Sequence, residues 1–246
     1  MIDTHAHLDA CAHPPDELVR RARDAGVGTI LTVGTTIERC RTALELADRH
    51  DDVFAIVGIH PHEATDDHDL DALRDLLADP RAVAVGETGL DFFREYAPHD
   101  RQRALFRQHL ELAAELGKPV VIHNRAADED VLEELASFEG TVVLHCFSSP
   151  SAMPTAIEHG YYVSFAGNAT YKNASELRLA ATQVAADRLL TETDAPYLSP
   201  EPLRGRPNEP ANVVHTLAAL ASARGEDVDE LAAQVDENAK RAFGLP

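Results

Sequence analysis

The chain has 246 residues, of which 44% are hydrophobic and 26% charged, with 13 glycines and 14 prolines. This is the composition of a globular protein, and it excludes a disordered tail protein, a collagen-like fibre and a disulfide scaffold. The longest apolar run, residues 53–57, is far shorter than the ~20 residues that a membrane-spanning helix needs. Because neither a basic segment nor an apolar signal core follows Met1, we expect a cytoplasmic protein with no membrane partner.

Acidic residues outnumber basic ones by 42 to 22, which gives a formal net charge of −20 at pH 7. The chain as a whole therefore lacks the basic footprint of a nucleic-acid-binding protein, so local charge must hold any anionic substrate. The carboxylates are scattered, and the lysines are only Lys118, Lys172 and Lys240. One hypothesis is that this acidic surface keeps a halophilic protein soluble in concentrated intracellular salt, which screens charge over short distances. An ordinary acidic cytosolic protein is the alternative.

Short apolar runs rich in β-branched residues recur along the chain and predict eight strands. In chain order the runs are residues 1–2, 29–33, 53–57, 82–85, 120–122, 141–144, 161–165 and 188–191. Their apolar residues are continuous rather than alternating, which is typical of parallel strands buried on both faces.

The segments between these runs show the period of amphipathic helices. The shared helix faces are formed by Leu70, Leu73 and Leu77, by Leu105, His109, Leu112 and Leu116, and by Val213, Leu217 and Leu220. The second of these helices should end at Gly117, and a last helix is expected over residues 228–243. Regular alternation of strand and helix predicts an α/β fold, a single (β/α)8 TIM barrel in one domain over residues 1–246. A doubly wound open sheet is the alternative, because alternation alone does not show closure.

Polar residues follow the predicted strands at their carboxyl ends, where barrel enzymes carry their active sites. In strand order they are His5 and His7 after the first, His60 and His62 after the third, Glu87 after the fourth, His123 after the fifth, His145 after the sixth and Asp194 after the eighth. Segments so far apart can meet in one place only if the barrel closes. The predicted fold and the predicted site therefore support each other.

Each of these residues also has an ordinary interpretation when it is taken alone. A histidine at a strand end is often a hydrogen-bonded core residue, Glu87 could form a plain ion pair, and Asp194 could cap a helix. The spacing of His5 and His7 places both imidazoles on one side of a strand, which is the geometry of a metal chelate. We expect the remaining histidines to be surface or packing residues: His13, His50, His68, His99, His109, His159 and His215.

The whole set indicates a metal site, and four imidazoles and two carboxylates are more ligands than one tetrahedral ion uses. Two divalent ions about 3.5–4 Å apart would use all of them and share Glu87. The mixture of imidazole and carboxylate favours Zn, Mn, Co or Ni over Mg and leaves the identity of the metal open.

The motifs together resemble those of the TatD family of metal-dependent deoxyribonucleases, which are amidohydrolase-like barrels. They are His5-Ala6-His7-Leu8, Gly58-Ile59-His60-Pro61-His62, Gly86-Glu87-Thr88-Gly89-Leu90-Asp91, Val121-Ile122-His123-Asn124-Arg125, His145-Cys146-Phe147-Ser148 and Glu192-Thr193-Asp194-Ala195-Pro196-Tyr197-Leu198. The resemblance covers essentially the whole chain. One departure is Ser149, where the family usually has glycine; a side chain there restricts φ, so the turn behind His145 is expected to differ slightly.

The resemblance implies a role for each matching residue. One metal would be bound by His5, His7, Glu87 and Asp194, and the second by Glu87, His123 and His145. Asp194 would also be the base that orients or deprotonates the attacking water. His60 is expected to contact the substrate. Arg125 and Arg204 are further candidates for phosphate contact.

The resulting prediction is a hydrolase that cleaves phosphodiester bonds of DNA, single-stranded or at ends, with no obligate protein partner. Hydrolysis of another ester or amide, such as deacylation of aminoacyl-tRNA, is the enzymatic alternative. Some amidohydrolases bridge their metals with a carbamylated lysine, but no lysine follows a predicted strand, which favours the nuclease branch. A non-catalytic metal-binding barrel would be expected to have a broken ligand set.

The hypothesis of a salt-adapted acidic surface predicts how stability depends on salt. We expect the melting temperature to rise as KCl is added up to molar concentration, because repulsion among surface carboxylates is then screened. The measurement is thermal unfolding followed by circular dichroism. Greater stability in dilute buffer would contradict the hypothesis.

Overall fold

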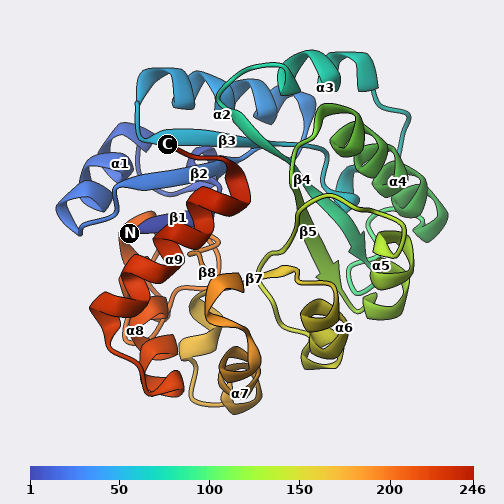
Figure 1. Ribbon diagram of the computed structural model, residues 1–246. Helices are drawn as coiled ribbons and strands as arrows, with labels where there is room; N and C mark the ends of the chain where they lie inside the picture. The colour runs from blue at the N-terminus through green and yellow to red at the C-terminus, as the bar shows by residue number, and fades with distance from the viewer.

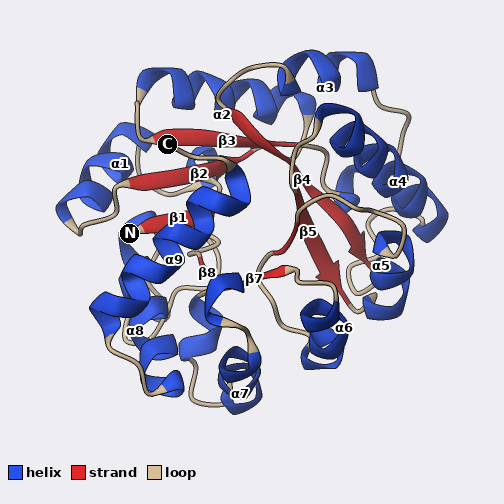
Figure 2. Cartoon of the chain, viewed as in Figure 1, coloured by secondary structure: helices blue, strands red, loops and turns tan.

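A computed structural model describes residues 1–246 and shows eight strands surrounded by helices (Figures 1 and 2). The strands are β1 (Ile2–Ala6), β2 (Thr29–Val33), β3 (Val53–Val57), β4 (Ala82–Asp91), β5 (Val120–Arg125), β6 (Val142–Leu144), β7 (Tyr162–Phe165) and β8 (Leu189–Thr191). They form one sheet in sequence order, and each strand pairs in parallel with the next.

The sheet closes between its first and last strands. Just beyond β8, Ala195 forms a parallel bridge with Ala6, and its carbonyl accepts a hydrogen bond of 2.7 Å from the His7 amide. The Asp194 amide donates to the His5 carbonyl at 2.9 Å. The predicted (β/α)8 barrel is therefore confirmed, and the alternative of an open sheet is wrong.

Helices surround the ring of strands, and the last of them lies across one end of it, as Figure 1 shows. They are α1 (Pro15–Asp24), α2 (Ile37–Arg49), α3 (Leu70–Leu77), α4 (His99–Leu116), α5 (Asp128–Leu135), α6 (Met153–Glu158), α7 (Ser175–Gln183), α8 (Val213–Arg224) and α9 (Val228–Phe243). Gly117 ends α4 with φ +63°, a left-handed conformation that glycine adopts without steric cost. None of these helices combines the length and apolar character that a membrane crossing requires.

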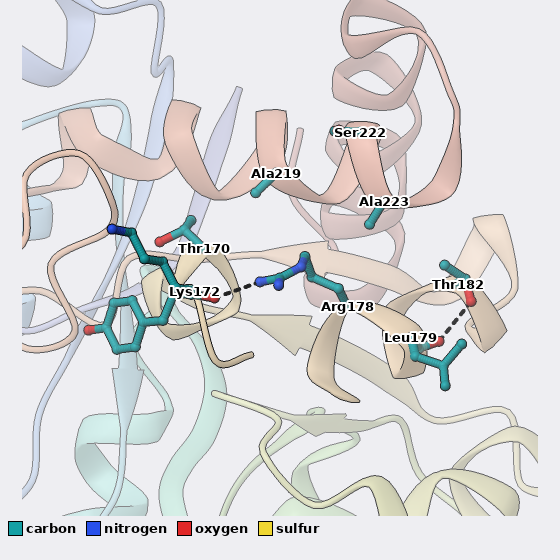
Figure 3. Close-up of a pocket in the computed structure, with 9 residues that line it drawn as sticks. Thr170, Lys172, Arg178, Leu179, Thr182, Ala219, Ser222 and Ala223 are labelled. Carbon is teal, nitrogen blue, oxygen red and sulfur yellow. Dashed lines mark hydrogen bonds between the residues drawn. The ribbon is translucent and has the colours of Figure 1, made fainter. Parts of the chain in front are cut away.

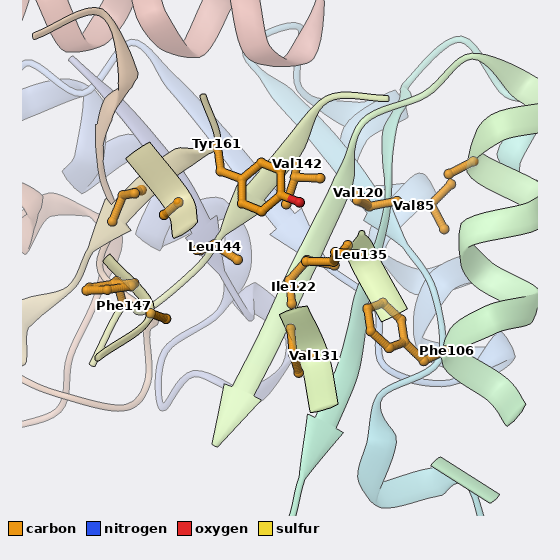
Figure 4. Close-up of a cluster of buried hydrophobic side chains, with 14 of the residues drawn as sticks. Val85, Phe106, Val120, Ile122, Val131, Leu135, Val142, Leu144, Phe147 and Tyr161 are labelled. Carbon is orange, nitrogen blue, oxygen red and sulfur yellow. The ribbon is translucent and has the colours of Figure 1, made fainter. Parts of the chain in front are cut away.

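Apolar side chains fill both faces of the sheet, which explains the continuous apolar runs in the sequence. On β5, Val120 and Ile122 pack outward against α4 and α5, in the cluster that Figure 4 shows around Phe106 and Leu135. Val121 points into the barrel, where a second cluster fills the interior and includes Phe243 of α9. Because apolar side chains fill this part of the interior, the polar groups of the barrel lie at the carboxyl ends of the strands.

The largest difference from the predicted elements concerns β4 and β5, which extend further than their apolar runs. Glu87 and His123 lie inside these strands rather than after them. The extension is possible because β4 and β5 pair over their polar ends, with Gly89 opposite His123 and Asp91 opposite Arg125. The first strand likewise continues through His5. Backbone pairing of these polar segments fixes the side chains of the site more firmly than loops would.

Gly89 allows β4 to approach β5 closely, and this generates a stability prediction. Its φ is +133°, and an added Cβ would lie 2.1 Å from the carbonyl oxygen of His123. We expect Gly89→Ala to lower the free energy of unfolding by about 2–4 kcal/mol, since backbone atoms must move. Gly28→Ala is the matched control, because no atom lies within 4 Å of its Cβ position. Urea unfolding compares the two variants, and equal stabilities would contradict the prediction.

Candidate metal centre

The carboxylate of Glu87 is the centre of a buried cluster at the carboxyl ends of the strands. Its side chain is only 4% exposed. Oε2 lies 3.3 Å from His5 Nε2 and 3.7 Å from His7 Nε2, and Oε1 lies 2.7 Å from His123 Nδ1, 2.8 Å from His145 Nε2 and 3.3 Å from His60 Nε2. The two oxygens of one carboxylate therefore face two separate groups of imidazoles. We call these six residues and Asp194 the Glu87 cluster.

Asp194 follows β8, and its carboxylate lies beside the imidazoles of His5 and His7. Its Oδ1 lies 3.6 Å from His7 Nε2 and 4.0 Å from His5 Nε2. The residue has φ +53°, and no helix begins there, so the alternative of a helix cap is wrong. The hydrogen bond from its amide to His5 ties the backbone after β8 to β1 beside the two imidazoles.

The donor atoms of the cluster fit a divalent cation. Both ring nitrogens of His5 are buried without a hydrogen-bond partner, because its 3.3 Å contact to Glu87 lacks hydrogen-bond geometry. A buried polar atom without a partner lowers the stability of the fold. A cation bound to one of these nitrogens would remove that penalty. Three groups each place their ligand atoms within 4.8 Å of one another: His5, Glu87 and His145; His5, His7 and Asp194; and His60, His62 and His123.

The electrostatics of the cluster keep Glu87 ionised. Burial raises the pKa of Glu87, but the facing imidazoles, first His145 and then His60, outweigh it and hold the pKa well below its usual range. Burial and the neighbouring His145 lower the pKa of His5, and burial lowers the pKa of His60 to about 4. His60 is therefore neutral near pH 7.

Two further carboxylates orient the imidazoles from behind, and sequence reasoning gave them no role. Glu192 Oε1 lies 3.1 Å from His145 Nδ1 and also accepts a hydrogen bond from the Cys146 amide. Asp91 Oδ2 lies 3.1 Å from His123 Nε2 and 2.7 Å from His62 Nε2. Histidines that bind metals commonly donate their second N–H to such a partner, which fixes the ring. Because alternate residues of a strand share a side, the spacing of Glu87 and Asp91 on β4 was a usable signal.

The structure places the two predicted arginines away from Glu87. Arg125 is exposed at the end of β5, and its guanidinium lies 4.3 Å from the centre of the Phe93 ring. Arg204 lies 4.1 Å from the centre of the Tyr171 ring. Neither arginine contacts the Glu87 cluster, so a role in substrate binding would concern the outer part of a longer substrate.

Two further predictions concern Ser149 and His109. Ser149 has φ −118°, so the turn after His145 does not require glycine here. His109 is a buried packing residue, as expected, and its Nε2 accepts a hydrogen bond of 3.0 Å from the Ile59 amide. That bond fixes the segment that carries His60.

An open groove of about 510 Å³ lies between α7 and α8, outside the Glu87 cluster (Figure 3). Lys172 and Ala219 line it on two sides. Arg178, also on its wall, donates hydrogen bonds to the carbonyls of Ala169 and Tyr171 and so holds the loop after β7. The buried ligand set of the barrel lies elsewhere, so the groove is not the centre of the chemistry.

A closed (β/α)8 barrel with buried imidazoles and carboxylates at its strand ends is typical of metal-dependent hydrolases. The family follows from comparison with known proteins. Residues 2–244 match the family model described as TatD related DNase, and the chain belongs to this family.

Relatives align with the chain over nearly its whole length. A Mycobacterium tuberculosis protein named as an uncharacterized metal-dependent hydrolase TatD is 42% identical over 267 residues, covering 100% of this chain and 98% of the relative. The 3'-5' ssDNA/RNA exonuclease TatD of Klebsiella pneumoniae is 38% identical over 241 residues, covering 94% and 92%. The crystal structure of the TatD homologue YJJV from Escherichia coli K12 matches with a TM-score of 0.94 and 32% identity, covering 100% and 98%.

The contact between Glu192 and His145 leads to a prediction about metal affinity. We expect Glu192→Gln to weaken binding of Zn(II) or Mn(II) roughly 10-fold or more, because a neutral amide orients and polarises the imidazole less well. Glu115→Gln is the control, since Glu115 is a surface carboxylate paired with Arg74. Calorimetric titration of metal-free protein measures both affinities. Unchanged affinity in the first variant would show that Glu192 does not support a ligand.

Proposed function

We propose that the protein is a deoxyribonuclease that hydrolyses phosphodiester bonds of single-stranded DNA or of DNA ends. The observation that carries this proposal is the position of Glu87, whose two oxygens face separate groups of imidazoles. Membership of the TatD family and the exonuclease name of the Klebsiella relative point to the same substrate.

The arrangement would suit two divalent cations, both held in part by Glu87. One would be held by His5, His7, Glu87 and Asp194, and the other by Glu87, His123 and His145, as the family resemblance implies. Bound cations supply positive charge to the phosphate and make a bound water more acidic, so that hydroxide is available near neutral pH.

Asp194 is suited to accept the proton of the attacking water. Burial raises its pKa, but the facing imidazole of His7, 3.6 Å away, and the imidazoles of His145 and His5 outweigh burial and lower the pKa below its usual value. Asp194 is therefore ionised near pH 7, and its side chain remains 13% exposed at the mouth. A carboxylate in this state acts as a general base when a water lies within hydrogen-bond reach.

His60 is placed to contact the substrate next to the reacting phosphate. Its Nε2 lies 3.3 Å from Glu87 Oε1, and its Nδ1 accepts a hydrogen bond from the His62 amide. The second contact leaves Nε2 as the nitrogen that carries the proton and can donate to a phosphate oxygen. Arg125 and Arg204 would contact phosphates further along the strand.

The positions of the lysines disfavour an amidohydrolase that relies on a carbamylated lysine. Lys118 donates a hydrogen bond to the carbonyl of Ala82, at the start of β4, and Lys240 pairs with Glu237 on α9. Lys172 lines the groove between α7 and α8. None of the three lysines therefore contacts the Glu87 cluster, and Glu87 would take the role that a carbamylated lysine has in those enzymes.

Asp194→Asn tests the assigned base. We expect kcat on labelled single-stranded DNA to fall at least ~100-fold, because the change removes a ligand charge and the base together, while the melting temperature stays close to that of the wild type. Asp24→Asn is the control, since Asp24 pairs with Arg20 on the surface. Unchanged turnover would remove Asp194 from the mechanism.

The same assay tests the substrate class when it is run on wild type with single-stranded DNA, duplex DNA, RNA and aminoacyl-RNA. Failure to cut DNA with Mn(II) or Mg(II) at both low and high salt would contradict the deoxyribonuclease assignment. If the protein instead deacylates aminoacyl-RNA, the assignment becomes that of an aminoacyl-RNA deacylase.

A further inference from the structure

Three aromatic side chains are exposed on the loops around the Glu87 cluster. Phe93 is 61% exposed, Tyr96 59% and Tyr197 58%. The first two lie on the loop between β4 and α4, and Tyr197 follows β8. The other large apolar side chains that are exposed are aliphatic and lie on helices: Ile157, Leu179 and Val228. The aromatic rings among them are thus confined to the end of the barrel that carries the site.

Tyr96 and Tyr197 stand on two different sides of the Glu87 cluster. The Tyr96 ring meets the His62 ring edge to face, with centroids 4.7 Å apart and planes at 89°. The Tyr197 ring meets the His7 ring in the same way, at 5.9 Å and 74°. His62 belongs to the group beside His123, and His7 to the group beside Asp194. Edge contacts of this kind hold a ring in place while much of its surface remains accessible.

The same loops carry cations that have no carboxylate partner. Most arginines on the body of the barrel form ion pairs, as Arg23 does with Asp52 and Arg107 with Glu134, although Arg41, Arg178 and Arg241 do not. At the carboxyl ends of the strands, no ion pair involves Arg125, at the end of β5, or these residues on the loops after β4, β7 and β8: Arg94, Lys172, Arg204 and Arg206. In a chain with a net charge of −20, these cations are groups on this face that can contact an anion.

Aromatic rings interleaved with free cations are the features that bind single strands, where bases stack on rings and cations follow the phosphates. An apolar protein surface would leave these cations desolvated and unpaired, so it fits this face poorly. We propose that Tyr96 and Tyr197 are base-stacking platforms that bind the bases on either side of the reacting phosphodiester. This inference rests on the proposed function and deepens it, because unpaired bases expose the faces that such rings require.

Equilibrium binding tests the platforms separately from catalysis. The probe is a fluorescein-labelled single strand with phosphorothioate linkages, titrated with the metal-loaded protein and followed by fluorescence anisotropy. We expect Tyr197→Leu and Tyr96→Leu each to raise Kd roughly 10-fold, because a flat ring is lost from the site. Tyr197→Phe and Tyr96→Phe should restore most of the lost affinity, since neither hydroxyl makes a hydrogen bond within the protein. Val228→Ala, an exposed apolar change on α9, is the control.

An abasic strand of equal length completes the test. We expect wild type to bind it about as weakly as the leucine variants bind the normal strand. Three results would contradict the proposal that Tyr96 and Tyr197 bind bases. They are equal binding of the normal and abasic strands by wild type, an unchanged Kd in both leucine variants, and no binding of either strand. If wild type binds with this dependence on bases but leaves an unmodified strand uncut, the proposed function fails and the platforms stand.

Discussion

The structure depends on compensating the negative charge of Glu87, a carboxylate buried where five imidazoles converge. Removing an ion from water costs several kcal/mol even after the protein relaxes, so such a group persists only with close partners. Those partners come from β1, β5, β6 and the segment after β3, and they can surround one carboxylate only when the sheet is a ring. The backbone hydrogen bonds that join His5 and His7 to residues 194 and 195 close the sheet and place two of the partners at the same time. Barrel closure and assembly of the site are therefore one event in this protein.

The carboxylates near the Glu87 cluster carry more negative charge than the imidazoles alone can balance. Asp91 and Glu192 are fully buried beside His123 and His145, and Asp194 faces His7. Without a cation, each ionised carboxylate in this region adds repulsion that only protonated imidazoles can offset. With divalent cations present, the imidazoles act as neutral ligands and the outer carboxylates orient them. The excess of buried acidic groups is thus a second reason, independent of the unpaired nitrogens of His5, why this chain suits a metal.

Much of the fold and the cluster follows from sequence because both rest on short-range regularities. Continuous apolar runs locate the strands, and polar residues at the strand ends identify His5, His7, His60, Glu87, His123, His145 and Asp194 as neighbours. The true ends of β4 and β5 could not be predicted in this way. The pairs Gly89–His123 and Asp91–Arg125 form because the two backbones approach closely, and the sequence does not show that approach. The roles of Asp91 and Glu192 were missed for a related reason. A carboxylate behind a ligand and a carboxylate facing a cation have the same local sequence signal, and only the direction of the imidazole ring tells them apart.

The charge of the chain shapes how a nucleic acid strand can approach it. Carboxylates over the barrel body repel phosphates, but this repulsion fades beyond roughly 8 Å at physiological ionic strength, so a strand is attracted only near the mouth, where free cations lie. Contacts between these cations and phosphates weaken steeply as salt is added, because counterions released into a more concentrated solution gain less entropy. Stacking of bases on Tyr96 and Tyr197 carries no charge and is not screened. An acidic nuclease working in concentrated salt would therefore depend more on its aromatic rings than on its arginines, and the exposed rings on both sides of the cluster are consistent with that division of roles.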